Sequence, residues 1–309
     1  MILPIRFKII LNTLSVIVPI YNEEETLSEY LEQWVAYCKK QGWQFILVDD
    51  GSTDGTQKLL TDQTNQKNLT IIRHKINKGY GAAIKAGIRA ADSEFVVTID
   101  GDGQHSLDSV VDLLRVIQET DADLVIGTRV NINKISVREI GKSIIKWISR
   151  IMIPNHISDL NSGMKIYKTE LARKYMIACP NTMAFSDIIS LTFLHNHCLV
   201  MEAPITVMPR KGGRSTISYK TAIDTVIEIV NIVMFFNPLR IFFPISAISI
   251  LAGLAWGIPL IIQGRGLSVG SLGSLLLGII SIFFGLISEQ LSQIRQLQVE
   301  FLEEKSTGK

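Results

Sequence analysis

Short hydrophobic runs rich in β-branched residues alternate with longer segments of helical periodicity over the first 127 residues of the chain. Such short runs are typical of buried strands, and the longer periodic segments are typical of helices. The alternation predicts an α/β fold with a doubly wound, mainly parallel sheet covered by helices on both faces. The predicted strands are 14–20, 45–49, 69–73, 95–99 and 124–127.

The segment 137–209 has a mixed pattern. It predicts a helix at about 137–151, a polar turn at 158–163, two further helices, and a strand through 200–207. These elements extend the α/β body.

Two long uncharged runs follow, 242–262 with 21 residues and 266–287 with 22. A helix of either length crosses a hydrocarbon core of about 30 Å. The linker 263–265 is short, so the runs predict a transmembrane helical hairpin.

Before these runs, apolar residues dominate 217–236, with polar residues every three or four positions. This pattern favours amphipathic helices in the membrane interface. An amphipathic helix packed on the soluble body is the alternative.

The distribution of basic residues predicts the orientation of the hairpin. Five Lys and Arg precede the first span from position 210 onward, Arg265 lies between the spans, and three follow the second. The positive-inside rule then places both termini in the cytosol. The predicted organisation is a cytosolic body at 1–216, juxtamembrane helices at 217–240, two spans at 241–288 and a cytosolic tail at 289–309.

Composition excludes several classes of protein. The formal net charge of +2 is too small for a surface that coats nucleic acid, so no nucleic-acid partner is expected. Three cysteines without CxxC spacing offer neither a disulfide framework nor a zinc site. The apolar N-terminus carries Arg6 and Lys8 and leads directly into a strand, so no cleavable signal peptide is expected.

Polar residues gather where three predicted strands end, at 19–23, 49–56 and 100–105. The carboxyl ends of parallel strands meet at one edge of a sheet, which is where such folds bind ligands. Asp100 and Asp102 follow a hydrophobic strand, and two hard oxygen ligands at this spacing can hold Mg²⁺ or Mn²⁺ beside a diphosphate. Gln104 could add a carbonyl oxygen, and His105 is interpreted as a supporting residue. An acidic turn without metal is the alternative.

Two more segments suit a nucleotide. At 49–50 one carboxylate can accept a hydrogen bond from a base or a ribose hydroxyl, whereas Ser52 or Asp54 could simply cap the next helix. The small residues of 77–83 let backbone N–H groups approach phosphate at a helix start, although they could serve only tight packing.

Taken together and in order, the motifs closely resemble the family-2 inverting glycosyltransferases. Within that family they resemble the polyprenyl-phosphate glycosyltransferases, which include dolichol-phosphate mannose synthase and, with two C-terminal spans, the bactoprenol glucosyltransferases. The resemblance covers essentially the whole chain. It rests on 18–24, 48–54, 77–81, 100–105, 126–129 and 159–165.

This resemblance implies a GT-A catalytic domain at 1–216 and assigns site residues. The implied nucleotide-sugar ligands are Pro19, Tyr21, Glu23, Asp49, Asp50, Lys78, Gly79, Asp100, Gly101 and Asp102, and the implied metal ligands are Asp100, Asp102 and Gln104. The implied acceptor-phosphate residues are Arg129, Arg138, Ser143, Arg210, Arg214 and Ser215. Asp100, Asp102, Arg129, Arg138 and Arg210 form the expected catalytic set.

The basic loop 210–216 is similar to the acceptor loop of the family, with Thr216 where Lys is usual. Arg214 is the candidate to replace the missing charge. A juxtamembrane charge cluster attracted to anionic lipid is the alternative.

The implied reaction is inverting transfer of a sugar, with glucose from UDP-glucose favoured by the two-span resemblance, to undecaprenyl phosphate at the cytosolic face of a bacterial inner membrane. GDP-mannose or UDP-N-acetylglucosamine could be the donor instead, and a non-catalytic membrane-anchored nucleotide-binding scaffold is the remaining alternative. A phosphate monoester is already largely dianionic at neutral pH, so the lipid phosphate needs no general base. Asp187 is therefore interpreted as a sugar-hydroxyl contact or a structural cap. A homo-oligomer and a separate flippase are the expected partners.

Overall fold

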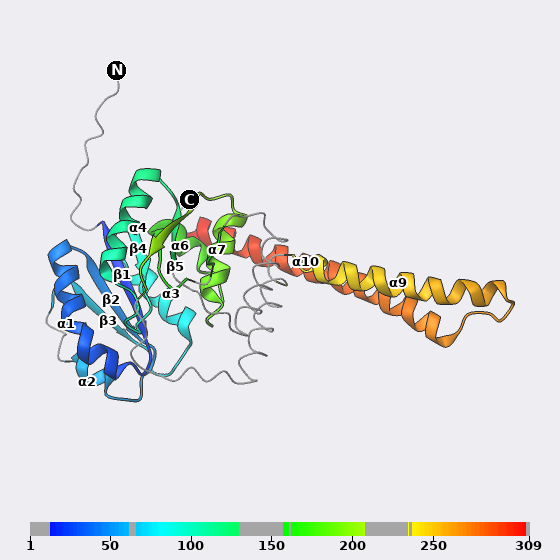
Figure 1. Cartoon of the computed structure of the whole chain (residues 1–309), viewed down its shortest axis with the longest axis horizontal. Helices are drawn as coiled ribbons and strands as arrows, with labels where there is room; N and C mark the ends of the chain where they lie inside the picture. Colours follow the sequence, from blue (N-terminus) through cyan, green and yellow to red (C-terminus); the bar gives the residue numbers. More distant parts are fainter. Residues whose placement is uncertain are drawn as a thin grey trace, which may run out of the picture. The chain divides into compact units, whose positions relative to one another are not determined.

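A computed structural model describes residues 13–61, 66–129, 157–160, 162–207, 234 and 237–306 (Figure 1). The chain divides into two compact units, Met1–Ile135 with Asn155–Thr216 and Ser136–Pro154 with Ile217–Lys309. The predicted helix at 137–151 lies outside the described residues, as does the predicted amphipathic segment 217–236 apart from residue 234.

The first unit is built on a mixed sheet, whose described strands run in the order β3-β2-β1-β4-β6-β5-β7. All neighbours pair in parallel except β6, which runs antiparallel to both β4 and β5. The five strands predicted first are all confirmed within two residues. The strands are β1 Leu14–Ile20, β2 Gln44–Asp49, β3 Leu69–Arg73, β4 Phe95–Thr98, β5 Leu124–Arg129, β6 Lys165–Lys168 and β7 Val200–Ile205.

Strand β6 is the element that the sequence pattern did not predict. It has only four residues and begins and ends with lysine, so it presents no hydrophobic run. Lys165 is nevertheless fully buried, because its ammonium donates to the carbonyl of Leu160 at 2.7 Å and to the hydroxyl of Ser186 at 2.6 Å. A cation whose N–H groups are all hydrogen-bonded can occupy a buried strand position, where an apolar residue is normally expected.

Helices cover both faces of this sheet, as predicted. They are α1 Glu24–Gln41, α2 Thr56–Thr61, α3 Tyr80–Ala90, α4 Leu107–Thr120, α6 Thr169–Tyr175 and α7 Phe185–His195. Successive residues of a strand point to opposite faces. Thus Val16 of β1 packs in the core with α1 and α4, whereas Ile17 faces Gly87 of α3.

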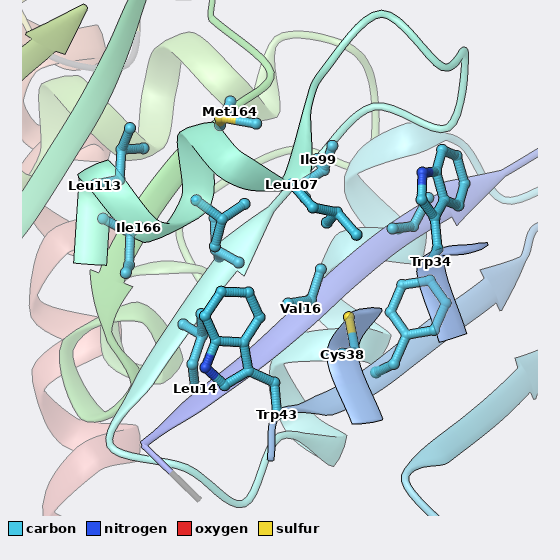
Figure 2. Close-up of a cluster of buried hydrophobic side chains, with 14 of the residues drawn as sticks. Leu14, Val16, Trp34, Cys38, Trp43, Ile99, Leu107, Leu113, Met164 and Ile166 are labelled. Atoms are coloured by element: carbon cyan, nitrogen blue, oxygen red, sulfur yellow. The ribbon is translucent and has the colours of Figure 1, made fainter. Parts of the chain in front are cut away.

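A hydrophobic core lies between the sheet and helices α1 and α4 (Figure 2). Leu14, Val16 and Cys38 are fully buried there, and Trp34 and Trp43 are nearly so. Each such apolar side chain contributes roughly 1.5–3 kcal/mol by leaving water. This packing holds the carboxyl ends of β1, β2 and β4 in a fixed arrangement.

The C-terminal unit contains α9 Leu239–Ile262 and α10 Val269–Ser306, which pack antiparallel. Small residues make the contact: Ser246 Oγ donates to the carbonyl of Gly278 at 2.7 Å, and a Cβ at Gly253 would lie 2.8 Å from Leu275. Both helices are long and apolar enough to cross a membrane. The two predicted spans are thus helical, and α10 continues to Ser306, through most of the predicted tail.

Candidate functional site

A cavity of about 560 Å³ opens at the carboxyl ends of β1, β2 and β4 in the first unit. Its position is the one that the polar strand ends predicted. The lining residues are Pro19, Ile20, Tyr21, Glu23, Asp50, Asn77, Gly79, Tyr80, Ala83, Asp100, Gly101, Asp102, Thr182 and Met183.

The loops after β1 and β2 are bound to each other beside this cavity. The backbone N–H of Asn22 donates to Ser52 Oγ at 3.0 Å, and Asn22 Oδ1 accepts from the N–H of Thr53 at 2.8 Å. Asp54 accepts from the N–H of Thr56 at 3.1 Å, so the capping interpretation of Asp54 is correct. These bonds place Tyr21 and Glu23 at the wall of the cavity.

The two adjacent aspartates at the end of β2 have different surroundings. Asp50 lines the cavity and accepts from the backbone N–H groups of Lys78 at 3.0 Å and Gly79 at 2.8 Å. Asp49 is fully buried, accepts from the N–H of Ser52 at 2.8 Å, and is not among the lining residues. Because neighbours on a strand face opposite ways, only one of the pair faces the cavity.

Asp100 and Asp102 both line the cavity from the loop after β4. The hydroxyl of Tyr80 donates to Asp100 Oδ1 at 2.8 Å, and His105 Nε2 lies 3.7 Å from Oδ2. Burial opposes ionisation of Asp100, but His105, the Tyr80 hydroxyl and the charge of Arg129 outweigh it and lower the pKa of this carboxyl. Asp100 is therefore held as a carboxylate.

These two carboxylates fit a divalent cation. Gly163 packs directly on Asp100, because a Cβ there would lie 2.0 Å from Oδ2, so the carboxylate has space that only glycine allows. Among the described residues no group of three His, Cys, Asp or Glu side chains could hold an ion. A cation here would thus need ligand oxygens beside the two carboxylates, which is usual for Mg²⁺ and Mn²⁺ next to phosphates. Gln104, the third predicted metal ligand, does not line the cavity. Its backbone N–H donates to Asp102 Oδ1 at 3.1 Å.

The small residues at the start of α3 serve close packing as well as the cavity. The N–H of Gly81 donates to the carbonyl of Asn181 at 2.9 Å, and a Cβ at Gly79 would lie 2.3 Å from that same oxygen. Lys85 Nζ also donates to Asn181 Oδ1 at 2.9 Å. These contacts bring the loop before α7 to the cavity wall.

Several lining residues were missed by the sequence analysis. Tyr80 and Ala83 lie inside the motif 77–83, where the argument considered only backbone groups. Thr182 and Met183 come from a loop whose composition carries no signal of a site. Their place depends on the packing of that loop against α3.

Arg129, at the end of β5, makes two parallel hydrogen bonds to Asp159, at 2.8 and 3.0 Å. These bonds and the charge of Asp159 outweigh the effect of desolvation and raise the pKa of Arg129. Glu202 of β7 in turn accepts from the N–H of Ser158 at 2.6 Å, which supports the turn that carries Asp159. Arg129 is not among the residues that line the cavity.

The remaining predicted acceptor residues lie outside the described part of the chain; they are Arg138, Ser143, Arg210, Arg214 and Ser215.

Asp187 is almost fully buried in the first turn of α7 and does not line the cavity. Burial lowers the pKa of the nearby Lys165 ammonium, and Asp187 and Asp159 oppose this shift. This buried position favours the structural interpretation of Asp187.

Two relatives of known name match most of the chain. One is the undecaprenyl-phosphate 4-deoxy-4-formamido-L-arabinose transferase of Pectobacterium atrosepticum, 28% identical over 81% of this chain and 76% of its own length. The enzyme of the same name from Proteus mirabilis is 27% identical over 82% and 77%.

A solved structure has a similar fold. It is glucosyl-3-phosphoglycerate synthase from Mycobacterium tuberculosis, with a TM-score of 0.56 and 15% identity over 71% of this chain and 79% of that one. Another structure of that synthase, with a TM-score of 0.55, contains Mn²⁺ and uridine-diphosphate-glucose. At this identity the likeness concerns the fold, which is GT-A-like.

Family models match both parts of the chain. A model described as the GtrB C-terminal hairpin matches residues 237–294, which include α9 and most of α10. The model of glycosyl transferase family 2 matches residues 15–180, more than half of the chain and nearly the whole lining of the cavity. The chain therefore belongs to glycosyl transferase family 2.

Proposed function

We propose that this family-2 glycosyltransferase moves a sugar from a nucleotide sugar to undecaprenyl phosphate, with inversion at the anomeric carbon. The observation that carries the proposal is the combination in one chain of an acidic cavity at the strand ends and a hairpin of two apolar helices. The first is suited to a nucleoside diphosphate and the second to an acceptor that lies in a membrane. The names of the relatives support the same acceptor.

The cavity offers a separate contact for each part of the donor. Tyr21 is 45% exposed at its wall and can stack on a base. Asp50 accepts hydrogen bonds only, and can receive one from the base or the ribose. Asp100 and Asp102 would hold Mg²⁺ or Mn²⁺, which supplies Lewis-acid stabilisation of the departing diphosphate. Tyr80 holds Asp100 in position for this role.

The reaction requires no proton transfer from the acceptor. An oxygen of the lipid phosphate forms a bond to the anomeric carbon while the bond from that carbon to the diphosphate oxygen breaks. The electron pair of the broken bond leaves with the nucleoside diphosphate. A phosphate monoester is mostly dianionic at neutral pH, so no side chain has to act as a base. The buried position of Asp187 agrees with this chemistry.

Two anionic reactants repel each other, and arginines offset that repulsion. Among the described residues, the hydrogen bonds of the Arg129 side chain go to Asp159 through two of its five N–H groups, and the other three are the ones proposed to bind phosphate. A guanidinium that is already oriented in this way binds phosphate with less loss of freedom. We assign the acceptor phosphate to Arg129 together with Arg138, Ser143, Arg210, Arg214 and Ser215.

The location and the donor are separate parts of the proposal, and the donor rests on the resemblance to two-span relatives. We propose that α9 and α10 cross a bacterial inner membrane with both termini and the cavity on the cytosolic side, and that a flippase and further copies of the chain are partners. Glucose from UDP-glucose remains the proposed sugar. The names of the relatives make 4-deoxy-4-formamido-L-arabinose a second candidate.

The test is a transfer assay with the purified full chain in detergent. Undecaprenyl phosphate and Mn²⁺ or Mg²⁺ are supplied with labelled UDP-glucose, UDP-N-acetylglucosamine, GDP-mannose or nucleotide-activated 4-deoxy-4-formamido-L-arabinose. Label that enters the organic phase from one donor, and only when the lipid is present, supports the proposal and names the sugar. A chain that binds nucleoside diphosphate but transfers label from no donor contradicts it.

A further inference from the structure

His74 lies directly behind the cavity carboxylate of Asp50. Its Nδ1 is 2.6 Å from Asp50 Oδ1, which is the shortest of the three contacts described for this carboxylate. Both side chains are nearly buried, with 10% of His74 and 4% of Asp50 exposed. His74 is not among the residues that line the cavity, so it reaches a ligand only through Asp50.

The parallel sheet places the imidazole there. Asp49 pairs with Arg73 in the β2–β3 ladder, and the N–H of His74 donates to the carbonyl of Asp49 at 2.9 Å. The ladder thus continues one residue beyond β3 and sets His74 beside Asp50. The segment after His74 also contacts Asp50, because the backbone N–H groups of Lys78 and Gly79 donate to its carboxylate.

The three donors leave one part of the carboxylate open. Within the part of the chain that the structure describes, Oδ1 accepts from both His74 and Lys78, whereas Oδ2 accepts from Gly79 alone. A carboxylate has about four acceptor positions. One position on Oδ2 therefore remains for a donor group of the ligand, provided that the carboxylate does not rotate.

We propose that His74 is a positioning residue for the nucleoside part of the donor, because it fixes the rotation of Asp50 and so presents the open position of Oδ2 to the cavity. This inference rests on the proposed function, since it assumes that the cavity binds a nucleoside diphosphate. Without the imidazole, the carboxylate of Asp50 keeps its bonds to the N–H groups of Lys78 and Gly79 but rotates more freely, and this freedom is lost when a ligand binds. The loss therefore falls on the affinity for the nucleotide and not on the later chemical step.

The experiment compares three variants of the full chain in detergent with Mn²⁺. His74→Phe keeps the size of the ring and removes the donor. His74→Asn retains an N–H near the position of Nδ1 and serves as the conservative rescue. Ile117→Val truncates a buried side chain of α4, a helix that contributes no residue to the cavity lining, and controls for a general loss of stability.

Binding of UDP and of GDP is measured by calorimetry, and the KM for the sugar nucleotide and for undecaprenyl phosphate is measured separately. We expect His74→Phe to weaken binding of the preferred nucleoside diphosphate about tenfold and to raise the sugar-nucleotide KM to a similar extent, with kcat and the lipid KM within about twofold. His74→Asn should recover most of the affinity, and Ile117→Val should keep all of it.

Two results would overturn the inference. If His74→Phe binds the nucleotide as the unaltered chain does, His74 does not position Asp50. If His74→Asn is as weak as His74→Phe while both remain folded, the ring matters for packing and not for its hydrogen bond. A failure of the proposed function looks different, because the unaltered chain would then transfer label from no donor. If that chain still bound UDP or GDP, the comparison of the His74 variants would still test this role, and if it bound neither, this role of His74 would fall as well.

Discussion

The α/β body, which is the first unit, and the C-terminal hairpin of α9 and α10 distribute the same kinds of side chain in opposite ways. In the body, Ile17 and Ile46 are fully buried, and polar groups gather at the cavity and the surface. In the hairpin, Ile262 is 80% exposed and Val269 is 90% exposed, while small residues such as Ser246 and Gly253 are buried between the helices. Apolar burial in water organises the body. The hairpin presents its apolar groups outward and packs through small residues, as helices in lipid do.

The largest effect is expected at the polar cavity of the body. Asp102→Ala should lower the transfer rate by at least about a thousandfold, because it removes one of the two carboxylates proposed to hold the cation. Removal of divalent cations with EDTA should have the same effect on the unaltered chain, and Mn²⁺ should restore only that chain. Thermal unfolding of the variant in detergent checks that the fold is intact. Full activity of Asp102→Ala would rule out this role of the carboxylate.

The next effect tests the burial of apolar side chains in the two regions. Ile46→Ala, in the centre of β2, should lower the free energy of unfolding by about 2–5 kcal/mol, because it leaves a cavity in the core. Ile262→Ala, at the exposed end of α9, should change it by less than about 0.5 kcal/mol. Denaturant unfolding in detergent measures both. If both variants lost the same free energy of unfolding, apolar burial would stabilise the hairpin in the same way as the body.

A smaller effect tests the small residues between α9 and α10. Gly278→Leu should destabilise the packed hairpin by about 1–3 kcal/mol, since a Cβ there would lie 2.5 Å from Ile250 and 3.0 Å from the carbonyl of Ser246. Gly273→Leu is the matched control, because nothing lies within 4 Å of a Cβ at that position of the same helix. Melting curves of both variants in detergent should separate them. If both melt alike, close packing at Gly278 does not support the hairpin.

The smallest effect concerns the hydrogen bond behind the proposed cation site. Tyr80→Phe should weaken Mn²⁺ binding in the presence of UDP about three- to tenfold, since it leaves Asp100 free to rotate. Tyr37→Phe removes an equally long hydrogen bond, from the Tyr37 hydroxyl to Asp108 at 2.8 Å, away from the cavity. Titration of Mn²⁺ by electron paramagnetic resonance should detect the first change and not the second. Unchanged affinity in Tyr80→Phe would mean that the hydroxyl does not orient the carboxylate.

Sequence patterns predicted the elements that depend on local periodicity. The runs that became β1 to β5 and the two long apolar helices were all found, because a buried strand and a helix apolar enough to cross a membrane both consist of continuous apolar residues. Strand β6 was missed because Lys165 is buried through the hydrogen bonds that its ammonium donates to Leu160 and to Ser186 of α7. No local pattern records such partners.

The site was predicted in part for a similar reason. The acidic strand ends identified Asp50, Asp100 and Asp102, all of which line the cavity. The doublet Asp49 and Asp50 could not be resolved by sequence, because the pleat decides which of two neighbours faces the ligand. Tyr80, Thr182 and Met183 belong to the site through packing between α3 and the loop before α7, which only the tertiary structure specifies.

The antiparallel insertion of β6 also has a consequence for the order of folding. Phe95 of β4 pairs with Lys168 of β6, so the chain must close a long loop before this part of the sheet can form. Pairing over such sequence distances is slow. Gly163, which backs Asp100, precedes β6 and is brought into place by that pairing. We expect the aspartates to acquire their final surroundings late in refolding, so that nucleotide binding returns last and reports the completed fold.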